Sequence, residues 1–106
     1  MDRSQSLNVP PFFDGNNYAF WKVHMRTFLC SINDTIWDAV EAGWTRPEAA
    51  KSTWDKATLA TTNANSKSLN AIFYGVSLDE FHRISHITVA KEAWEILETT
   101  TKKRRK

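Results

Sequence analysis

The segment FFDGNNYAFWKVHMRTFL, residues 12–29, places a tight turn directly in front of a run rich in aromatic side chains. Asp14, Gly15 and the two asparagines that follow are typical turn residues, and either asparagine can cap a helix. Behind the turn, apolar residues recur mostly at intervals of three or four, the period of one helix face. They are Trp21, Met25, Phe28, Leu29 and Ile32. We therefore expect a buried helix face, with Tyr18 and Trp21 clamping the preceding arm onto the core.

Two further helix patterns follow this one. The segment DTIWDAVEAG, residues 34–43, carries apolar residues on one face, and Gly43 is well placed to end the helix. A third helix is expected from Pro47 to about Tyr74, because proline is favoured in the first turn. Its polar stretch, residues 61–68, has poor helix propensity, so a bend or a break there is the alternative.

Two shorter patterns complete the series. Ser77 is followed three residues later by Glu80, the spacing of a capping box, which predicts a helix over residues 78–84. Thr88 is expected to cap the last helix. The apolar face of that helix is formed by Ala90, Ala93, Trp94 and Leu97. Alternating strand patterns of useful length do not occur in the sequence.

The composition fits one small helical domain. The chain has 106 residues, five of them tryptophan, six phenylalanine and only three glycine, which favours helices packed through large rings. We expect an all-α bundle of about five helices. Residues 1–16 are expected to form an extended N-terminal arm, residues 17–100 the helical domain and residues 101–106 a basic tail.

The expected compartment is the cytoplasm. No stretch reaches the roughly 18 apolar residues of a membrane span, and the N-terminal sequence lacks the apolar run of a signal peptide. The single cysteine, Cys30, fits a reducing compartment. Import into the nucleus through the basic tail is the alternative.

Basic residues are concentrated at the C-terminal end of the sequence. Five of the 14 lysines and arginines are Lys102, Lys103, Arg104, Arg105 and Lys106, which leaves nine basic against 12 acidic side chains, or net −3, in the rest. The body is therefore mildly acidic and the tail alone is basic. Such a run is typical of weak, non-specific RNA or DNA binding, of a nuclear import signal, or of a solvated terminus.

The sequence carries no pattern for catalysis. Its three glycines are far apart, so there is no phosphate-binding loop, and a nucleophile elbow is absent. His82 and His86 are four residues apart, with Asp79 one turn earlier, a spacing compatible with a metal site on one helix face. The helix is expected to end between the two histidines, so we interpret them as a solvated helix end. We expect no enzymatic activity, no bound metal and no cofactor.

Two tryptophans lie outside the predicted apolar faces. Trp44 follows the glycine that ends the second helix, and Trp54 lies among polar residues. A partly exposed tryptophan is a typical anchor of a protein–protein contact. Trp44 and Trp54 are therefore interface candidates, whereas Trp21, Trp37 and Trp94 are expected in the core.

Four separated blocks of the sequence resemble one known family. The block of residues 12–29 resembles the N-terminal signature of Gag polyproteins from plant copia-type LTR retrotransposons, in which a Phe precedes Gly, Asn and Tyr, and then Trp, Met and Leu follow at helical spacing. The next blocks, in the order of the family, are IWDAVEAGW, LNAIFYGVSLDEFHRIS and AKEAWEILETT. The resemblance covers residues 9–100, nearly the whole sequence.

The resemblance implies the fold of a retroviral capsid N-terminal domain, a helical bundle that packs with copies of itself into a shell around RNA. The expected partners are the chain itself or related Gag chains, in a weak homo-oligomer, with no membrane and no small-molecule substrate. In the family, a second helical domain and an RNA-binding zinc knuckle follow. With one cysteine, this sequence contains no zinc knuckle.

Two functional hypotheses stay open. The first is a structural self-association module that contributes to particle assembly, or a domesticated fragment of one. The second is a small nuclear or nucleic-acid-associated protein that acts through Lys102–Lys106 and interferes with the assembly of Gag.

Overall fold

A computed structural model describes residues 9–104, with side chains described as far as Thr101. This part of the chain forms five α-helices and one short 3-10 helix, so the predicted all-α class is confirmed. The elements are α2 (Tyr18–Ile32), α3 (Asp34–Ala42), η1 (Lys51–Thr53), α4 (Lys56–Tyr74), α5 (Leu78–Ile84) and α6 (Ala90–Arg104).

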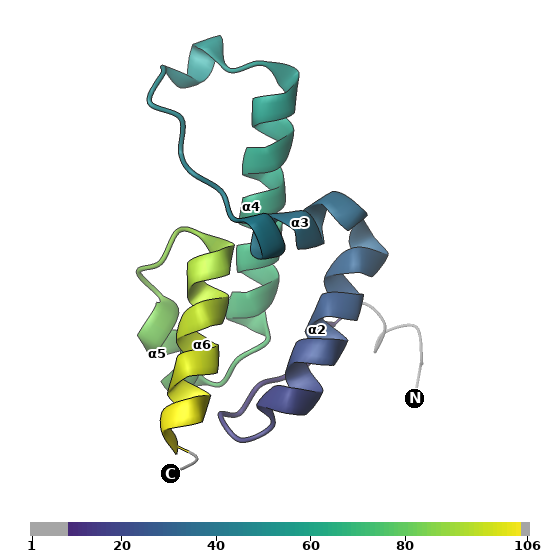
Figure 1. Ribbon diagram of the computed structural model, residues 1–106, viewed down its shortest axis with the longest axis vertical. Coiled ribbons are helices and arrows are strands. Elements are labelled where there is room, and N and C mark those ends of the chain that lie inside the picture. Colours follow the sequence, from purple (N-terminus) through teal and green to yellow (C-terminus); the bar gives the residue numbers. More distant parts are fainter. Residues whose placement is uncertain (1–8, 105–106) are drawn as a thin grey trace.

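The longest helix, α4, organises the others. In Figure 1 its C-terminal half lies among α2, α5 and α6, and α3 crosses it near its middle. The first half of α4 projects beyond the bundle together with the loop of residues 43–55, and we call this part, residues 43–63, the protruding lobe. The radius of gyration is 14.6 Å, above the roughly 13 Å of a compact domain of about 100 residues. The lobe explains this elongation.

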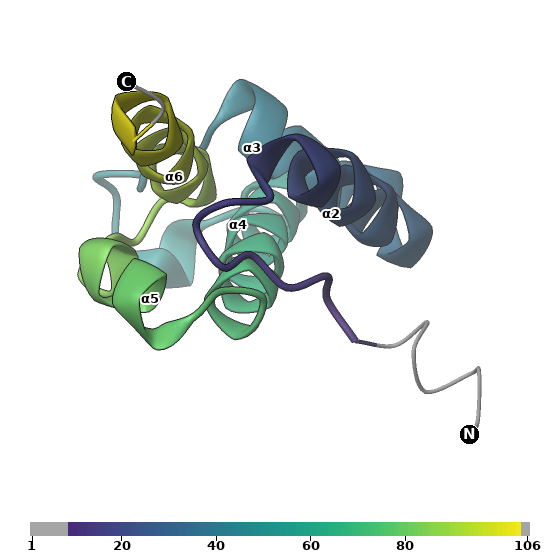
Figure 2. The same cartoon turned by 90° about the horizontal axis from the view of Figure 1, so that it is seen from below.

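The N-terminal arm is part of the core. Phe13 is fully buried, and its ring centre lies 5.2 Å from that of Trp21. The Phe13 N–H donates to the carbonyl of Gly75 at 2.6 Å, and the Ser77 N–H donates to the carbonyl of Phe13 at 2.9 Å. These bonds form an isolated bridge between the arm and the α4–α5 connection. Figure 2 shows the arm crossing beneath the end of α4 before it enters α2.

The predicted clamp on the arm is confirmed. Trp21 is fully buried, and its indole N–H donates to the carbonyl of Pro11 at 3.2 Å. The ring of Tyr18 meets Phe13 edge-on, with 6.1 Å between the ring centres. On its other side Trp21 contacts Trp94 of α6 at 4.6 Å. One group of rings therefore joins the arm, α2 and α6.

Two details of the predicted α2 are wrong. Asn17 occupies the N-cap position, but its side chain makes no capping bond. Its Oδ1 accepts from the N–H of Asp14 and its Nδ2 donates to the carbonyl of Phe12, so the side chain closes the turn instead. Ile32 is 50% exposed, because it belongs to the last turn of α2, where the helix leaves the core.

The boundaries of α3 and α5 agree with the sequence patterns. Gly43 ends α3 with φ of 87°, a left-handed conformation that favours glycine. The Ser77 hydroxyl caps α5 by accepting from the N–H of Glu80 at 3.4 Å. Glu80 is itself buried and lies 3.5 Å from Arg83.

The predicted start of α4 at Pro47 is wrong. The helix begins at Lys56, because the side chain of Asp55 caps it by accepting from the N–H of Thr58 at 2.8 Å. These bonds from Thr58 lower the pKa of Asp55. From there α4 runs unbroken to Tyr74, so the polar stretch of residues 61–68 causes no break.

Helix α6 is capped from outside its own segment. The Oδ1 of Asn65, in α4, accepts from the Ala90 N–H at 2.8 Å, and the Nδ2 donates to the carbonyl of Thr88 at 2.8 Å. The predicted cap by Thr88 is therefore replaced by a side chain of another helix. The predicted apolar face of α6 is confirmed, since all four of its residues are buried. The helix continues to Arg104, so the first four residues of the predicted tail belong to it.

Candidate interaction surfaces

The two interface candidates from the sequence belong to the protruding lobe. Trp44 and Trp54 are both half-buried. The Trp44 indole N–H donates to the Thr62 hydroxyl at 3.1 Å, and that of Trp54 donates to the carbonyl of Ala49 at 3.0 Å. The Arg46 guanidinium lies 5.4 Å from the centre of the Trp54 ring. Much of each indole is thus used to fold the lobe, and only the remainder is open to a partner.

The histidines do not share a helix. Helix α5 ends at Ile84, so His82 lies on the helix and His86 lies in the connection after it. Among the described residues no group of three or more His, Cys, Asp or Glu side chains is arranged to hold a metal ion. No helix within residues 9–104 has the length and apolar character needed to cross a membrane.

Most of the basic tail lies beyond Thr101, the last residue whose side chain the structure describes. Lys102, Lys103 and Arg104 form the last turn of α6, but their side chains lie outside the described residues. Arg105 and Lys106 lie outside the described chain altogether. Of the basic run, the structure therefore describes only the backbone of residues 102–104, at the C-terminal end of α6.

One group of partly uncovered apolar side chains lies away from the candidate tryptophans. Between α2 and α4 an open cavity of about 330 Å³ is lined by Phe28 and Ile32 from α2, Tyr74 from α4, and Pro10 from the arm. Tyr74 is 75% exposed and Ile32 50%. Lys67 lies at the same cavity. We call these apolar residues, Pro10, Phe28, Ile32 and Tyr74, the apolar patch.

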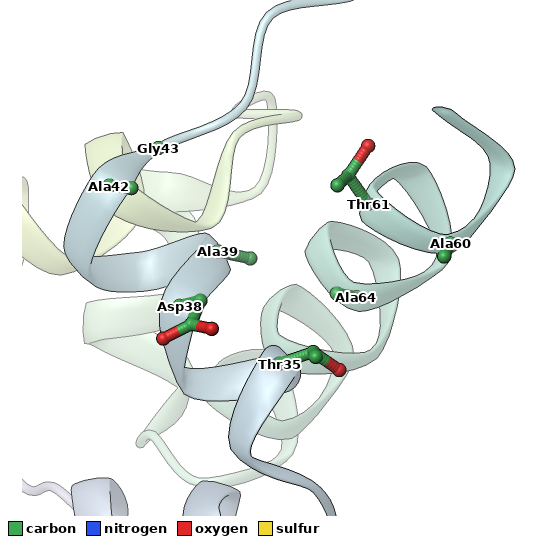
Figure 3. Close-up of a pocket in the computed structure, with 8 residues that line it drawn as sticks. All are labelled: Thr35, Asp38, Ala39, Ala42, Gly43, Ala60, Thr61 and Ala64. Carbon is green, nitrogen blue, oxygen red and sulfur yellow. The ribbon is translucent and has the colours of Figure 1, made fainter. Parts of the chain in front are cut away.

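A smaller pocket of about 210 Å³ lies between α3 and α4 (Figure 3). Most of its lining consists of small side chains, including Ala39, Ala60 and Ala64. The polar side chains drawn with them come from Thr35, Asp38 and Thr61. The pocket is a shallow gap where small residues face each other, and its polar groups form no set suited to catalysis.

A third surface follows the seam between α2 and α6. Two adjoining cavities of about 510 and 380 Å³ share Tyr18, Lys22 and Glu98, and we call them together the α2–α6 trough. The larger cavity is also lined by Arg26, Trp37 and Trp94, and the smaller one reaches Thr101 near the end of α6.

The wall of the trough is built from rings. The Trp94 indole N–H donates to the Tyr18 hydroxyl at 2.9 Å, and Trp37 meets Trp94 edge-on at 5.4 Å between ring centres. Burial raises the pKa of Tyr18 to about 12, so the phenol stays neutral and keeps its hydroxyl. Trp37 is half-buried, so the expectation that it belongs to the core holds only in part.

Sequence patterns pointed to neither the apolar patch nor the trough. The i, i+4 spacing of Lys22 and Arg26 was a usable signal for a charged stripe on α2. The patch had no comparable signal, because it joins residues 10 and 74, which only the folded chain brings together.

Comparison with known proteins identifies no relative. No protein family, curated protein or solved structure matches this chain.

Proposed function

We propose that this chain is a non-enzymatic structural module that associates weakly with copies of itself, as a capsid-like domain of a copia-type Gag polyprotein would. The sequence resemblance over residues 9–100 supports the class of protein. The observation that carries the self-association is the apolar patch, where Tyr74 and Ile32 leave most or half of their surface uncovered. Exposed groups of large apolar side chains mark contact surfaces more often than isolated ones do.

The proposed contact joins one apolar patch to the same patch of a second copy. Four side chains cover only a small area, so the interface falls in the range of weak complexes, below about 1,200 Å² in total. Weak contacts suit an assembly that must form reversibly. Lys67 at the edge of the patch would approach the Lys67 of the other copy, and the body without its tail carries a net charge of −3, so two copies repel each other. Salt screens this repulsion and should therefore strengthen association.

The test measures mass by light scattering over a concentration series at low and high salt. The chain is expected to be a monomer or weak dimer at micromolar concentration and to associate further when concentrated. A chain that stays monomeric at millimolar concentration in both salts would overturn the proposal.

Variants separate the two surfaces that could carry the contact. Tyr74→Ser should weaken association without lowering the melting temperature much, because Tyr74 is 75% exposed. Leu59→Ser is the matched control, since Leu59 is 42% exposed on the same helix but belongs to the protruding lobe. If Leu59→Ser and Trp44→Ala weaken association and Tyr74→Ser does not, the contact belongs to the lobe and its tryptophans.

The proposal places the module in the cytoplasm. The alternative function, a nucleic-acid-associated protein acting through Lys102–Lys106, predicts binding that is insensitive to sequence and falls steeply with salt. Replacing the five basic residues by glutamine in the full chain should then abolish the binding.

A further inference from the structure

Two cations of α2 are held in place along the α2–α6 trough. The Arg26 guanidinium lies 5.4 Å from the centre of the Trp37 ring, and the Lys22 ammonium lies 5.6 Å from the centre of the Tyr18 ring. A cation over a ring face is attracted to it, so each contact restricts a long side chain. Because they are four residues apart on one helix, Lys22 and Arg26 are neighbours on the same face.

Within the part of the chain that the structure describes, neither cation forms a salt bridge with a carboxylate. The salt bridge found there joins Arg83 to Glu80, away from the trough. Lys22 and Arg26 are exposed, so their donors face solvent at the edge of the cavity. Two fixed, unpaired cations on one wall favour an anionic occupant.

Among the residues that line the trough, one side chain is acidic. Glu98 contributes one carboxylate to the trough. Beyond Glu98 and Thr101, α6 continues into the turn formed by Lys102–Arg104, so the trough leads toward the most basic part of the sequence.

We propose that the α2–α6 trough binds the phosphodiester backbone of a single-stranded nucleic acid, with Lys22 and Arg26 contacting phosphates. The trough is elongated, since its two cavities follow the seam between two helices, and this shape suits a chain more than one small anion. Trp94 is only 9% exposed, but the half-buried Trp37 leaves part of its ring open beside the cations, the combination found where proteins hold single strands without reading their sequence. This inference goes beyond the proposed self-association and does not depend on it.

The experiment uses the full chain and a fluorescent oligouridylate, with binding followed by anisotropy over a salt series. Lys22→Gln combined with Arg26→Gln should weaken binding on the order of tenfold at 0.1 M salt, and the slope of log affinity against log salt should fall by about 1.4, or 0.7 for each lost phosphate contact. The control is Lys51→Gln with Lys56→Gln, which removes the same charge from exposed residues of the protruding lobe.

A second variant tests the trough in the opposite direction. Glu98→Gln removes the carboxylate that the trough contains and should tighten binding, whereas Glu48→Gln, an exposed residue of the lobe, should change it less. Melting curves establish that each variant is folded. If the double variant unfolds, the single variants test the trough instead: Lys22→Gln should weaken binding of the oligouridylate and Glu98→Gln should tighten it.

Three results would overturn the inference. The first is a trough variant that binds no more weakly than the lobe control, which would assign all binding to the tail. The second is poly-glutamate competing as well as the oligouridylate, which would mark a site for acidic peptides. The third is inorganic phosphate displacing the oligouridylate at equal phosphate concentration, which would mark a small-anion site.

Discussion

The two halves of α4 are stabilised in different ways. The C-terminal half is enclosed by the arm, α2, α5 and α6, and its residues Ala71 and Ile72 are buried. In the protruding lobe, residues 43–63, no side chain is buried. The lobe depends instead on hydrogen bonds from Trp44 and Trp54 and on the Asp55 cap.

This difference shows where the free energy of folding is concentrated. Burial of large rings scales with apolar area and involves residues far apart in the sequence, so the enclosed half unfolds only with the whole domain. Single hydrogen bonds at half-exposed positions each contribute about 1 kcal/mol. We therefore expect the lobe to open locally before the bundle unfolds, and four predictions test this contrast.

The largest effect is expected for Trp21→Ala. Trp21 is fully buried between Phe13 and Trp94, and truncating such a residue costs about 3 to 5 kcal/mol through lost burial and the cavity left behind. Urea denaturation followed by circular dichroism measures the loss. A variant that melts within a few degrees of the parent would contradict the central place of Trp21 in the core.

Gly75→Ala should separate the arm from the bundle. A Cβ at residue 75 would lie 2.6 Å from the carbonyl oxygen of Pro11 and 2.8 Å from the Met25 Cε. The backbone contact cannot relax unless the arm moves, so a loss of about 1 to 3 kcal/mol is expected. The comparison is Gly43→Ala at the base of the lobe, where the Cβ meets only the Lys91 side chain at 3.2 Å. Its cost, about 1 to 3 kcal/mol, comes instead from backbone strain, because φ of 87° with ψ of 176° is a conformation that side chains rarely adopt. Hydrogen exchange at the Phe13 and Ser77 amides should rise in Gly75→Ala alone, and an equal rise in both variants would contradict the contrast.

Asn65→Ala should lower stability at the boundary between the two halves. It leaves the Ala90 N–H and the Thr88 carbonyl without the bonds that Asn65 supplies, at a cost of about 1 to 3 kcal/mol. The matched control is Asn63→Ala, which truncates an exposed asparagine of the same helix. Thermal denaturation should leave this control near the parent and lower the melting temperature of Asn65→Ala. An Asn65→Ala variant with the melting temperature of the parent would show that α6 needs no cap from α4.

The smallest effect is expected for Trp44→Phe. The change keeps an aromatic ring but removes the bond to the Thr62 hydroxyl, so global stability should fall by no more than about 1 kcal/mol. Hydrogen exchange should nevertheless rise in residues 43–63 alone. A double-mutant cycle with Thr62→Val measures the coupling, which should be near the value of one hydrogen bond. Faster exchange throughout the bundle would mean that the lobe and the core unfold together.

The sequence by itself determined most of the helices and the centre of the core. Apolar spacing located α2, α3 and α6, and the pairing of Trp21 with the arm followed from the turn in front of it. The Ser77 cap and the Gly43 stop also followed from local chemistry. These features depend on residues within a few positions of each other, and periodic and capping patterns in the sequence predict such local contacts.

Only the tertiary structure decided how distant segments meet. The Asn65 side chain reaches a backbone group 25 positions away, Phe13 pairs with Val76, and Ile32 and Tyr74 come together at one surface. The sequence also did not predict where α4 begins. Pro47 and Asp55 are both residues typical of a helix start, and the hydrogen bond from the Trp54 indole to Ala49 fits a helix that begins after Asp55. Local sequence patterns carry no information on contacts between residues far apart in the sequence. The apolar patch and the trough therefore form only when α2 packs with α4 and α6 in the folded chain.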